Sequence, residues 1–144
     1  MERLTGRPLV SGSAEGTALV AEEPLSFWGG VDPATGEVID RRHHLSGQTI
    51  GGRVLVVPYS RGSSTTSTVL LETIRVHTAP AAIISSSVDS MLALGPIVAD
   101  ELYHRTFPVI ALEGDQFRRI QTGDRLVVHP DGTIERDPVA KEEI

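Results

Sequence analysis

The sequence of 144 residues contains no cysteine. The chain therefore forms no disulfide bond, offers no thiolate to zinc, has no cysteine nucleophile and cannot by itself ligate an iron–sulfur cluster. A domain of this length buries roughly 70% of the surface that its unfolded chain exposes, which is enough for a stable core without such links. We expect one domain over residues 1–144, with a charged, frayed tail from residue 137 onward.

Aromatic residues and lysines are also scarce. Aromatic residues make up 4% of the chain, the only lysine is Lys141, and the net charge is −6. Proteins that bind nucleic acid need a basic face and aromatic side chains that stack on bases, so we expect no nucleic-acid partner. The other basic residues are arginines, which suit carboxylate and phosphate recognition, although a GC-rich coding sequence gives the same bias.

Long apolar runs are missing as well. The longest, residues 91–99, is interrupted by Gly95 and Pro96 and is much shorter than the roughly 20 residues of a membrane-spanning helix. The first residues lack the charged and then apolar pattern of a secretory signal. We therefore expect a cytoplasmic protein with no membrane among its partners.

Several short β-prone runs are present instead. The run at residues 53–57 is apolar after its arginine, which is typical of a strand buried on both faces. We predict strands at residues 16–20, 53–57, 81–84 and 108–112, and a hairpin formed by residues 122–128 and 133–136. Two segments between these strands have the apolar spacing of helices. One helix begins after Ser63 or Ser64 and runs to about residue 77, and the other covers residues 88–103 with an interruption near Gly95 and Pro96.

The order of these elements indicates the fold class. Strands alternate with helices in the middle of the chain, and β segments flank them at both ends. This order predicts an α/β domain with a mixed sheet or a distorted barrel. Asp89, Asp100 and Glu101 are most simply polar residues on the surfaces or at the ends of the helices.

The glycine-rich residues 27–52 predict a long loop, and loops of that length are usually functional or disordered. Asp32 begins a run with the chemistry of a tight turn, so by itself it is more simply a turn residue than a catalytic acid. His43 and His44 are adjacent and would point different ways in regular structure, and no acidic residue lies at metal-ligand spacing. We predict no metal site there, although one of the two histidines could contact a ligand.

The turn after the strand at residues 53–57 is the strongest candidate site, because amides at a helix N-terminus beyond the end of a sheet commonly bind anions. Gly62 permits a close backbone approach, and Arg61 offers a fork to a carboxylate or phosphate. Ser63 lies at the positive end of the helix dipole, where an alkoxide forms more easily. A plainer interpretation stays open, in which Ser63 and Ser64 cap the helix and Arg61 is a solvated surface residue.

A series of motifs resembles the aconitase X swivelling domain. They are residues 27–33 (Phe-Trp-Gly-Gly-Val-Asp-Pro), the Thr35-Gly36 turn, residues 47–51, and residues 56–63 followed by Ser67, Val69 and Leu70. The resemblance runs from about Pro8 to Val128, which we take as the core of the domain. It implies a swivelling β/β/α fold, with helices packed on a mixed sheet or distorted barrel.

The resemblance also implies a function, because members of this family are hydro-lyases. They include the dehydratases of mevalonate 5-phosphate and of cis-3-hydroxy-L-proline. It implies that the chain is the small subunit of a heterodimer or higher assembly, docked on a larger subunit that holds an iron–sulfur cluster through its own cysteines. The chain alone is then expected to bind no cofactor.

The resemblance implies roles for single residues. In the family the serine after the Arg-Gly or Lys-Gly pair is the proton acceptor, and here that serine is Ser63. The implied reaction removes a proton next to the substrate carboxylate while the iron of the partner's cluster takes the leaving hydroxyl. Residues expected to contact substrate are Arg61, Gly62, Ser64, Ser67, Gly29, Gly30, Asp32 and His43.

The sequence departs from the family where Ser60 replaces a common glycine and His44 a common proline, both next to the expected site. These departures leave the substrate open. Residues 98–101 (Val-Ala-Asp-Glu) resemble bacterial members of the family more than archaeal ones, so a hydroxyproline-type or other small hydroxy acid is slightly favoured over mevalonate 5-phosphate. Two other functions also fit the residues. One is a non-catalytic regulatory module that binds carboxylate or phosphate on the same fold. The other is a phosphohistidine carrier, which requires His43 or His44 on an exposed turn.

Overall fold

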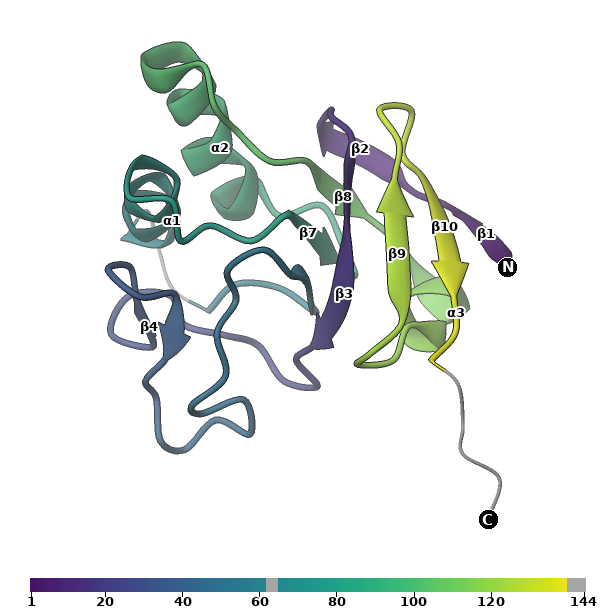
Figure 1. The fold of residues 1–144 in the computed structure, drawn as a ribbon, viewed down its shortest axis with the longest axis horizontal. Helices are drawn as coiled ribbons and strands as arrows, with labels where there is room; N and C mark the ends of the chain where they lie inside the picture. The colour runs from purple at the N-terminus through teal and green to yellow at the C-terminus, as the bar shows by residue number, and fades with distance from the viewer. Residues whose placement is uncertain (62–64, 140–144) are drawn as a thin grey trace.

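The computed structural model describes residues 1–61 and 65–139. Its main strands are β1 (Glu2–Thr5), β2 (Arg7–Val10), β3 (Ala14–Val20), β6 (Val54–Val57), β7 (Ala82–Ser85), β8 (Val109–Ala111), β9 (Arg125–Val128) and β10 (Thr133–Asp137). They form one eight-stranded mixed sheet in the order β1-β10-β9-β3-β6-β7-β8-β2 (Figure 1). The central strands β3, β6, β7 and β8 are parallel, and their neighbours on both sides are antiparallel.

Two longer helices, α1 (Thr65–Arg75) and α2 (Ser90–Tyr103), provide the crossovers between the parallel strands. Figure 1 shows α1 and α2 together at one side of the sheet, whereas the short helix α3 (Gly114–Arg119) lies by β9 and β10. The expected α/β fold with helices packed on a mixed sheet is confirmed. The described residues contain no helix that is long and apolar enough to cross a membrane.

The sheet curls without closing. Its two edge strands, β1 and β2, follow each other in the chain and are joined by Gly6, whose amide donates to the carbonyl of Gly132 over 3.0 Å. A Cβ atom on Gly6 would collide with the side chain of Ile110, so this position requires glycine. Of the two sheet forms expected from the sequence, the structure has the open mixed sheet, bent so that its edges approach each other.

The core has two parts because side chains alternate across the strands. Leu55 and Val57 of β6 belong to a cluster that includes residues of α1 and α2, whereas Val54 and Val56 belong to a second cluster with residues of β9 and β10. All four side chains are fully buried. The strand predicted to be buried on both faces is confirmed.

The predicted interruption of the second helix is wrong, since α2 continues through Gly95 and Pro96. Gly95 lies where α1 and α2 approach closely, and a Cβ atom there would be 2.7 Å from the carbonyl oxygen of Ser67. Pro96 has no N–H to donate, but its own carbonyl accepts a hydrogen bond of 2.7 Å from the Thr106 hydroxyl. These residues fit close helix packing rather than a break.

The sheet also extends beyond residues 8–128. Leu4 of β1 and Ile134 of β10 are fully buried, and the strands β1 and β2 were not expected. Val139 donates its amide to Asp124 over 3.0 Å. Of the expected tail, residues 140–144 lie outside the described residues.

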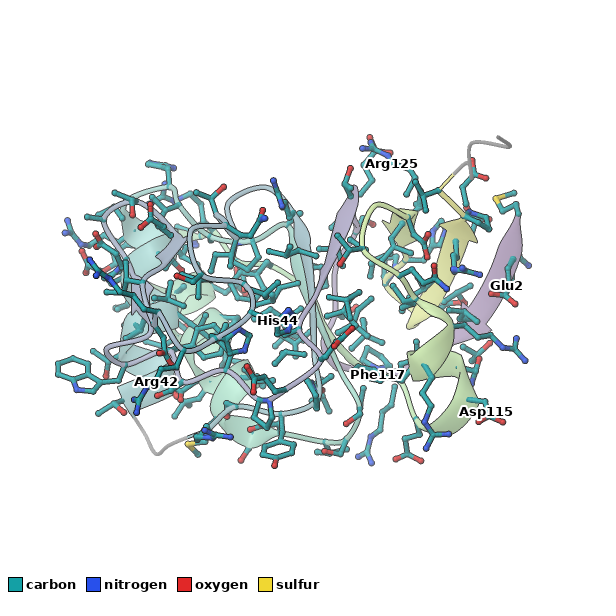
Figure 2. The ribbon with its side chains drawn as sticks, turned by 90° about the horizontal axis from the view of Figure 1, so that it is seen from below. Glu2, Arg42, His44, Asp115, Phe117 and Arg125 are labelled. Carbon is teal, nitrogen blue, oxygen red and sulfur yellow. The ribbon has the colours of Figure 1, made fainter. Side chains whose placement is uncertain are left out.

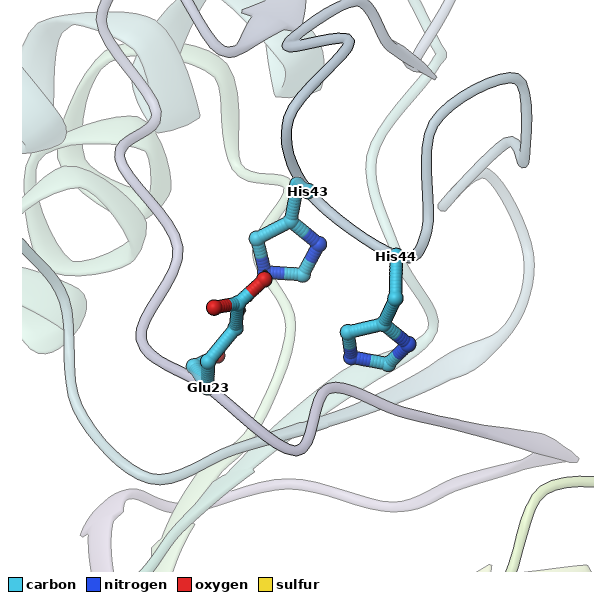
Figure 3. Close-up of side chains that lie close together, drawn as sticks. All are labelled: Glu23, His43 and His44. Carbon is cyan, nitrogen blue, oxygen red and sulfur yellow. Dashed lines mark hydrogen bonds and ion pairs between the residues drawn. The ribbon is translucent and has the colours of Figure 1, made fainter.

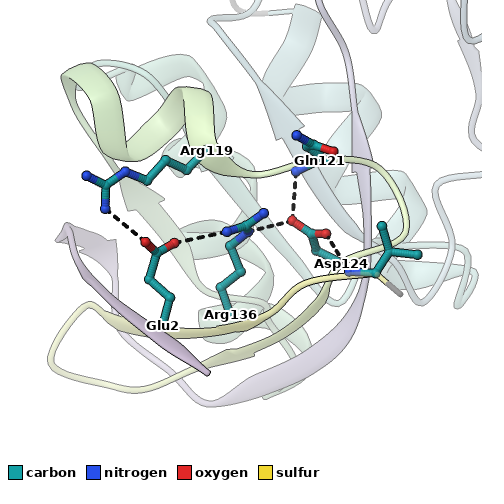
Figure 4. A network of polar contacts seen from close by, with 6 residues as sticks. Glu2, Arg119, Gln121, Asp124 and Arg136 are labelled. Atoms are coloured by element: carbon teal, nitrogen blue, oxygen red, sulfur yellow. Dashed lines mark hydrogen bonds and ion pairs between the residues drawn. The ribbon is translucent and has the colours of Figure 1, made fainter. Parts of the chain in front are cut away.

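A polar network ties the sheet edge together around Asp124, a buried carboxylate (Figure 4). One oxygen accepts from the Gln121 amide over 2.8 Å and from Arg136 Nε over 2.6 Å. Arg136 also pairs with Glu2 over 3.0 Å, and Glu2 pairs with Arg119 over 2.9 Å. The network therefore joins β1, β10, the end of α3 and the turn before β9.

Candidate active site

The site forms where β6 and β7 end side by side. Val57 pairs with Ser85 in parallel register, so the segments that follow the two strands meet at the same edge of the sheet. Ser86 donates its amide and its hydroxyl to the carbonyl oxygen of Pro58, over 3.1 and 2.8 Å. Two loops that are far apart in the sequence are thereby held in contact.

Asp89 joins these loops to the second helix. Its Oδ2 accepts from the amide of Ser60 over 2.8 Å and from the hydroxyl of Ser60 over 2.9 Å. Its Oδ1 accepts from the amide of Met91 over 3.0 Å, so the same carboxylate caps α2. The sequence indicated only a polar residue at a helix end, and the contact with Ser60 has no local signal.

The strand and helix on either side of the predicted catalytic turn are both present. Arg61 follows Ser60, and α1 begins at Thr65. Gly62, Ser63 and Ser64 lie outside the described residues. The roles proposed for these three residues therefore stay predictions, and Arg61 and Thr65 are the nearest described residues.

A cavity of about 260 Å³ opens beside Arg61. It is lined by Glu23, Pro24, Ser26, Asp40, Arg42, His43 and Arg61. The Arg61 amide donates to the carbonyl oxygen of Leu25 over 3.0 Å, which brings residues 23–26 against the turn. Figure 2 shows the loop residues Arg42 and His44 on the face viewed.

Two of the residues predicted to bind substrate, Arg61 and His43, thus meet at one cavity. Sequence analysis missed the acidic and basic residues around them, Glu23, Asp40 and Arg42. The charged run next to His43 was a weak signal for this wall. With two guanidinium groups and two carboxylates, the cavity can bind a ligand that carries both a carboxylate and an amine.

His43 and His44 do not point different ways, contrary to the expectation for regular structure. They lie in a turn where their rings stack, with centroids 4.8 Å apart and planes at 22° (Figure 3). His43 Nε2 lies 3.8 Å from Oε1 of Glu23, so one carboxylate and two imidazoles come close enough to hold a metal ion. Sequence spacing could not reveal Glu23 because it lies 20 residues earlier.

The hydrogen bonds of these rings decide what they can bind. His43 Nδ1 accepts from the Leu45 amide over 3.1 Å, which leaves the proton on Nε2, facing the carbonyl oxygen of Glu23 at 3.4 Å. His44 Nε2 accepts from the Glu22 amide over 2.9 Å, which leaves its proton on Nδ1. Neither neutral ring then has a free lone pair for a metal. This pattern supports a structural role for the pair and is unfavourable for phosphorylation of the buried His43.

Other residues predicted to contact substrate lie elsewhere. Asp32 forms the expected tight turn, with its carbonyl accepting from Gly36 over 2.7 Å and its carboxylate accepting from Ala34 over 3.0 Å. Gly29 and Asp32 line a separate, largely apolar hollow of about 350 Å³ beside the exposed Trp28. The turn at Asp32 is therefore confirmed, at a place distinct from the cavity at Arg61.

Gly30 and Ser67 have structural contacts. A Cβ atom on Gly30 would collide with the carbonyl oxygen of Ser26, a residue that lines the cavity at Arg61. Ser67 is buried in α1 and donates its hydroxyl to the Met91 carbonyl of α2 over 3.2 Å. Gly30 lets the loop turn tightly behind the cavity, and Ser67 fixes one helix against the other.

A larger hollow of about 650 Å³ lies between His44 and α3, and sequence analysis missed it. Its walls include Glu22, Leu45, Phe117 and Arg118. Figure 2 shows His44 and Phe117 on the viewed face. His44 and α3 thus lie on opposite walls of one hollow.

Comparisons with known proteins cover nearly the whole chain. A family model described as the aconitase X swivel domain matches residues 3–136. The crystal structure of the holo-form of Thermococcus kodakaraensis aconitase X superposes with a TM-score of 0.84 and 36% identity, over 96% of this chain and 100% of that chain.

Relatives of two kinds match the chain. The cis-3-hydroxy-L-proline dehydratase of Pseudomonas aeruginosa is 50% identical over 134 residues, which cover 90% of this chain but 22% of that protein. The phosphomevalonate dehydratase small subunit of Methanosarcina mazei is 36% identical over 135 residues, which cover 92% of this chain and 90% of that subunit. The small subunit of Methanopyrus kandleri is 42% identical over 84% of this chain and 86% of its own length. The chain thus spans 22% of the hydroxyproline dehydratase and most of each small subunit.

Proposed function

Because this chain belongs to the aconitase X swivel domain family, we propose that it is the small subunit of a dehydratase that acts on a small hydroxy acid. The observation that carries the proposal is its match over 90% of the length of the Methanosarcina mazei small subunit. The name small subunit implies a large subunit, which in this proposal supplies the rest of the enzyme. The proposed reaction is loss of water from neighbouring carbons of cis-3-hydroxy-L-proline or mevalonate 5-phosphate.

Ser63 is the proposed base. It lies two residues after Arg61 and two residues before the first residue of α1, so a guanidinium and a helix N-terminus lie close to it in the chain. Both features stabilise negative charge on a serine oxygen. Ser63, as the alkoxide, accepts the proton from the carbon next to the substrate carboxylate, and the electron pair of that C–H bond forms the double bond as the hydroxyl leaves with its bonding pair as hydroxide. Return of one proton from Ser63 then gives water and restores the alkoxide. Exclusion of water by the large subunit strengthens these interactions.

Arg61 is the proposed contact for the substrate carboxylate, and Arg42 adds positive charge nearby. Both line the cavity beside the catalytic turn, and Glu23 and Asp40 in the same wall can accept hydrogen bonds from a substrate amine or hydroxyl. A ring amino acid such as hydroxyproline carries both groups. Mevalonate 5-phosphate has no amine to donate to Glu23 or Asp40, so the acidic residues of the wall support the hydroxyproline type over the phosphorylated acid.

An iron–sulfur cluster does not fit this chain, because the chain has no cysteine to ligate it. We therefore assign the cluster to the large subunit. There it would supply a Lewis acid for the leaving hydroxyl. The part of the reaction that this chain supplies is the base and one wall of the substrate site.

The test is co-expression of the chain with a large subunit encoded beside it, followed by separate assays with the two substrates. We expect dehydration that is lost in Ser63→Ala, with the two chains still purifying together. Thr68→Ala, an exposed change three residues into α1, is the matched control and should keep full activity. Activity retained by Ser63→Ala would overturn the assignment of the base.

A second function is favoured by the lining of the cavity at Arg61, which combines two arginines with two acidic residues. A regulatory module that binds a carboxylate would need no partner. Calorimetric titration of the isolated chain with proline and with mevalonate distinguishes the two functions. Micromolar binding by the isolated chain favours the module, whereas a half-site of a shared enzyme binds weakly or not at all.

A further inference from the structure

The exposed apolar side chains are unevenly distributed over the described residues. Apart from Met1 and Val139 near the two ends, the large exposed hydrophobic residues are Trp28, Ile39, Tyr59, Val88, Leu94, Ile97 and Leu102. None of them lies on β1, β9, β10 or α3. All belong to the loops that follow the parallel strands or to α2, in the half of the molecule that carries the longer helices (Figure 1).

Helix α2 is apolar on both sides. Leu92 and Ala99 are buried against the rest of the domain, whereas Leu94, Ile97 and Leu102 are 43%, 47% and 60% exposed. The three exposed residues occupy positions i, i+3 and i+8 of the helix, within about two and a half turns. The other exposed positions of α2 are the polar Ser90, Asp100 and Glu101. A surface helix normally keeps its large apolar residues on the buried stripe, so three of them on the exposed side are unusual.

Helix α1 provides an internal comparison. It packs beside α2 and buries Val69, Leu70 and Ile74, but its exposed positions are the polar Thr68 and Arg75. The exposed positions of α1 are therefore all polar, whereas half of those of α2 are large apolar residues. The difference lies in the sequence of α2 and not in the position of the helices on the sheet.

The apolar surface of α2 begins at the proposed active site. Asp89 caps α2 and also holds Ser60 through two hydrogen bonds. Tyr59 and Val88, the residues just before each of them, are both 51% exposed. The surface thus continues from the edge of the catalytic turn along the outer side of the helix.

We propose that this outer face, formed by Tyr59, Val88, Leu94, Ile97 and Leu102, is the docking surface for the large subunit. The proposal rests on the proposed function, which requires that partner. In a relative where the matching segment is 22% of one chain, the remainder is always present to pack against it, and permanent interfaces are rich in apolar contacts. Asp100 and Glu101 are exposed between Ile97 and Leu102, so the partner surface should combine apolar side chains with arginine or lysine opposite these carboxylates.

The test uses a tagged large subunit co-expressed with this chain. In the double variant Leu94→Asp/Ile97→Asp we expect affinity for the large subunit to fall by at least about 100-fold, with the melting temperature of the small subunit unchanged. Arg125→Asp on β9 is the control, since it adds the same charge to the other half of the molecule. Wild-type affinity in the double variant would overturn the proposal.

Crosslinking keeps the test decisive if the double variant fails to fold. A photoreactive benzoylphenylalanine at position 102 should crosslink to the large subunit, and one at position 125 should not. Light scattering on the isolated chain tests the alternative occupant. A dimer that the α2 variants dissociate, together with an intact complex with the large subunit, would assign the face to a second copy and overturn the proposal.

Failure of this proposal and failure of the proposed function give different results. If α2 variants release the large subunit but the wild-type complex dehydrates neither substrate, the docking surface stands and the activity is wrong. If Ser63→Ala abolishes activity while α2 variants keep the complex, the activity stands and the docking surface is wrong.

Discussion

The Asp89 carboxylate accepts both hydrogen bonds that Ser60 can donate, from its amide over 2.8 Å and from its hydroxyl over 2.9 Å. The other oxygen of the same carboxylate caps α2 at Met91. A single side chain therefore fixes the residue before Arg61 to the start of the second helix. The position of the catalytic turn and the packing of α2 are thereby linked.

Substitution of Asp89 should affect both the position of the catalytic turn and the packing of α2. Asp89→Asn leaves only one acceptor oxygen, so either the cap or the two bonds to Ser60 must be lost. We expect destabilisation of about 1–2 kcal/mol. In the assembled enzyme we expect kcat to fall about 10-fold, which corresponds to about 1.4 kcal/mol. Urea unfolding of the isolated chain and steady-state kinetics of the complex measure the two effects.

Ser60→Ala separates the two roles, because it removes only the hydroxyl bond and leaves the helix cap intact. It should lower kcat with little change in stability, and the double variant with Asp89→Asn should lose less than the sum of the single changes. Ser11→Ala, which removes a hydroxyl bonded to Pro130 in the other half, is the matched control. Strict additivity of the two changes would show that the contact does not position the turn.

The buried network at Asp124 predicts a dependence of stability on pH. Burial alone would raise the pKa of this carboxyl, but the Gln121 amide, the Arg136 guanidinium and the Val139 amide together outweigh it and lower the pKa below its usual value. Unfolded aspartate has a pKa of about 3.9. The stability that Asp124 contributes is therefore fully present above that pH and is lost as the pH falls through the lower folded pKa.

Asp124→Asn should remove this contribution. At pH 7 we expect a loss of about 3 kcal/mol, the low end for a broken buried ion pair, because Arg136 keeps Glu2 as a partner. The free energy of unfolding should then fall less steeply with acid than in the wild type. Asp100→Asn, at an exposed position of α2, is the control. An acid limb as steep in Asp124→Asn as in the wild type would contradict the assignment to Asp124.

The strand before the catalytic turn was predictable from the sequence, because Val54–Val57 is apolar at every position and its length excludes a helix. β1 and β2 were not, since each has four residues and Pro8 lies inside β2. Proline is tolerated there because β2 is an edge strand that pairs only with β8. The prediction of a break in α2 was wrong because Gly95 is required by the close approach of α1. That contact is with a residue far away in the sequence, so the local sequence does not reveal it.

Only the part of the candidate site that comes from one continuous segment of the chain was predictable. Arg61 belongs to a strand, turn and helix unit, and that unit has a local sequence signal. The rest of the cavity comes from a loop whose path depends on contacts such as Arg61 to Leu25 and His43 to Leu45. Such contacts have no periodicity, so Glu23 and Asp40 had no signal that would place them beside Arg61.

The hydrogen bonds of His43 and His44 predict that the pair binds no divalent metal. One equivalent of Zn²⁺ should change the melting temperature by less than about 1 °C, because neither ring offers a free lone pair. Nitrogen-15 NMR of the rings should show the proton on Nε2 of His43 and on Nδ1 of His44. A rise of several degrees with Zn²⁺ that disappears in His43→Ala would show instead that the loop rearranges to form a metal site.

Gly95→Ala should destabilise the chain by about 1–3 kcal/mol, although alanine favours helices. The added Cβ atom would lie 2.7 Å from the carbonyl oxygen of Ser67, so α1 and α2 must move apart. Ser90→Ala, at an exposed position of the same helix, should change stability by less than about 0.5 kcal/mol. Equal melting temperatures for Gly95→Ala and the wild type would mean that the two helices do not require glycine at their contact.

Arg61 and Arg42 form a matched pair for testing the cavity. Both line it, but Arg61 is anchored through its amide to Leu25, whereas the Arg42 side chain is 96% exposed and lies 3.8 Å from Asp40. Lysine cannot form the two parallel hydrogen bonds by which a guanidinium binds a carboxylate. In the assembled enzyme we expect Arg61→Lys to raise KM about 10-fold and Arg42→Lys to leave KM nearly unchanged. Equal effects of the two changes would indicate general attraction by positive charge, and a larger effect of Arg42→Lys would place the carboxylate at the loop instead of the turn.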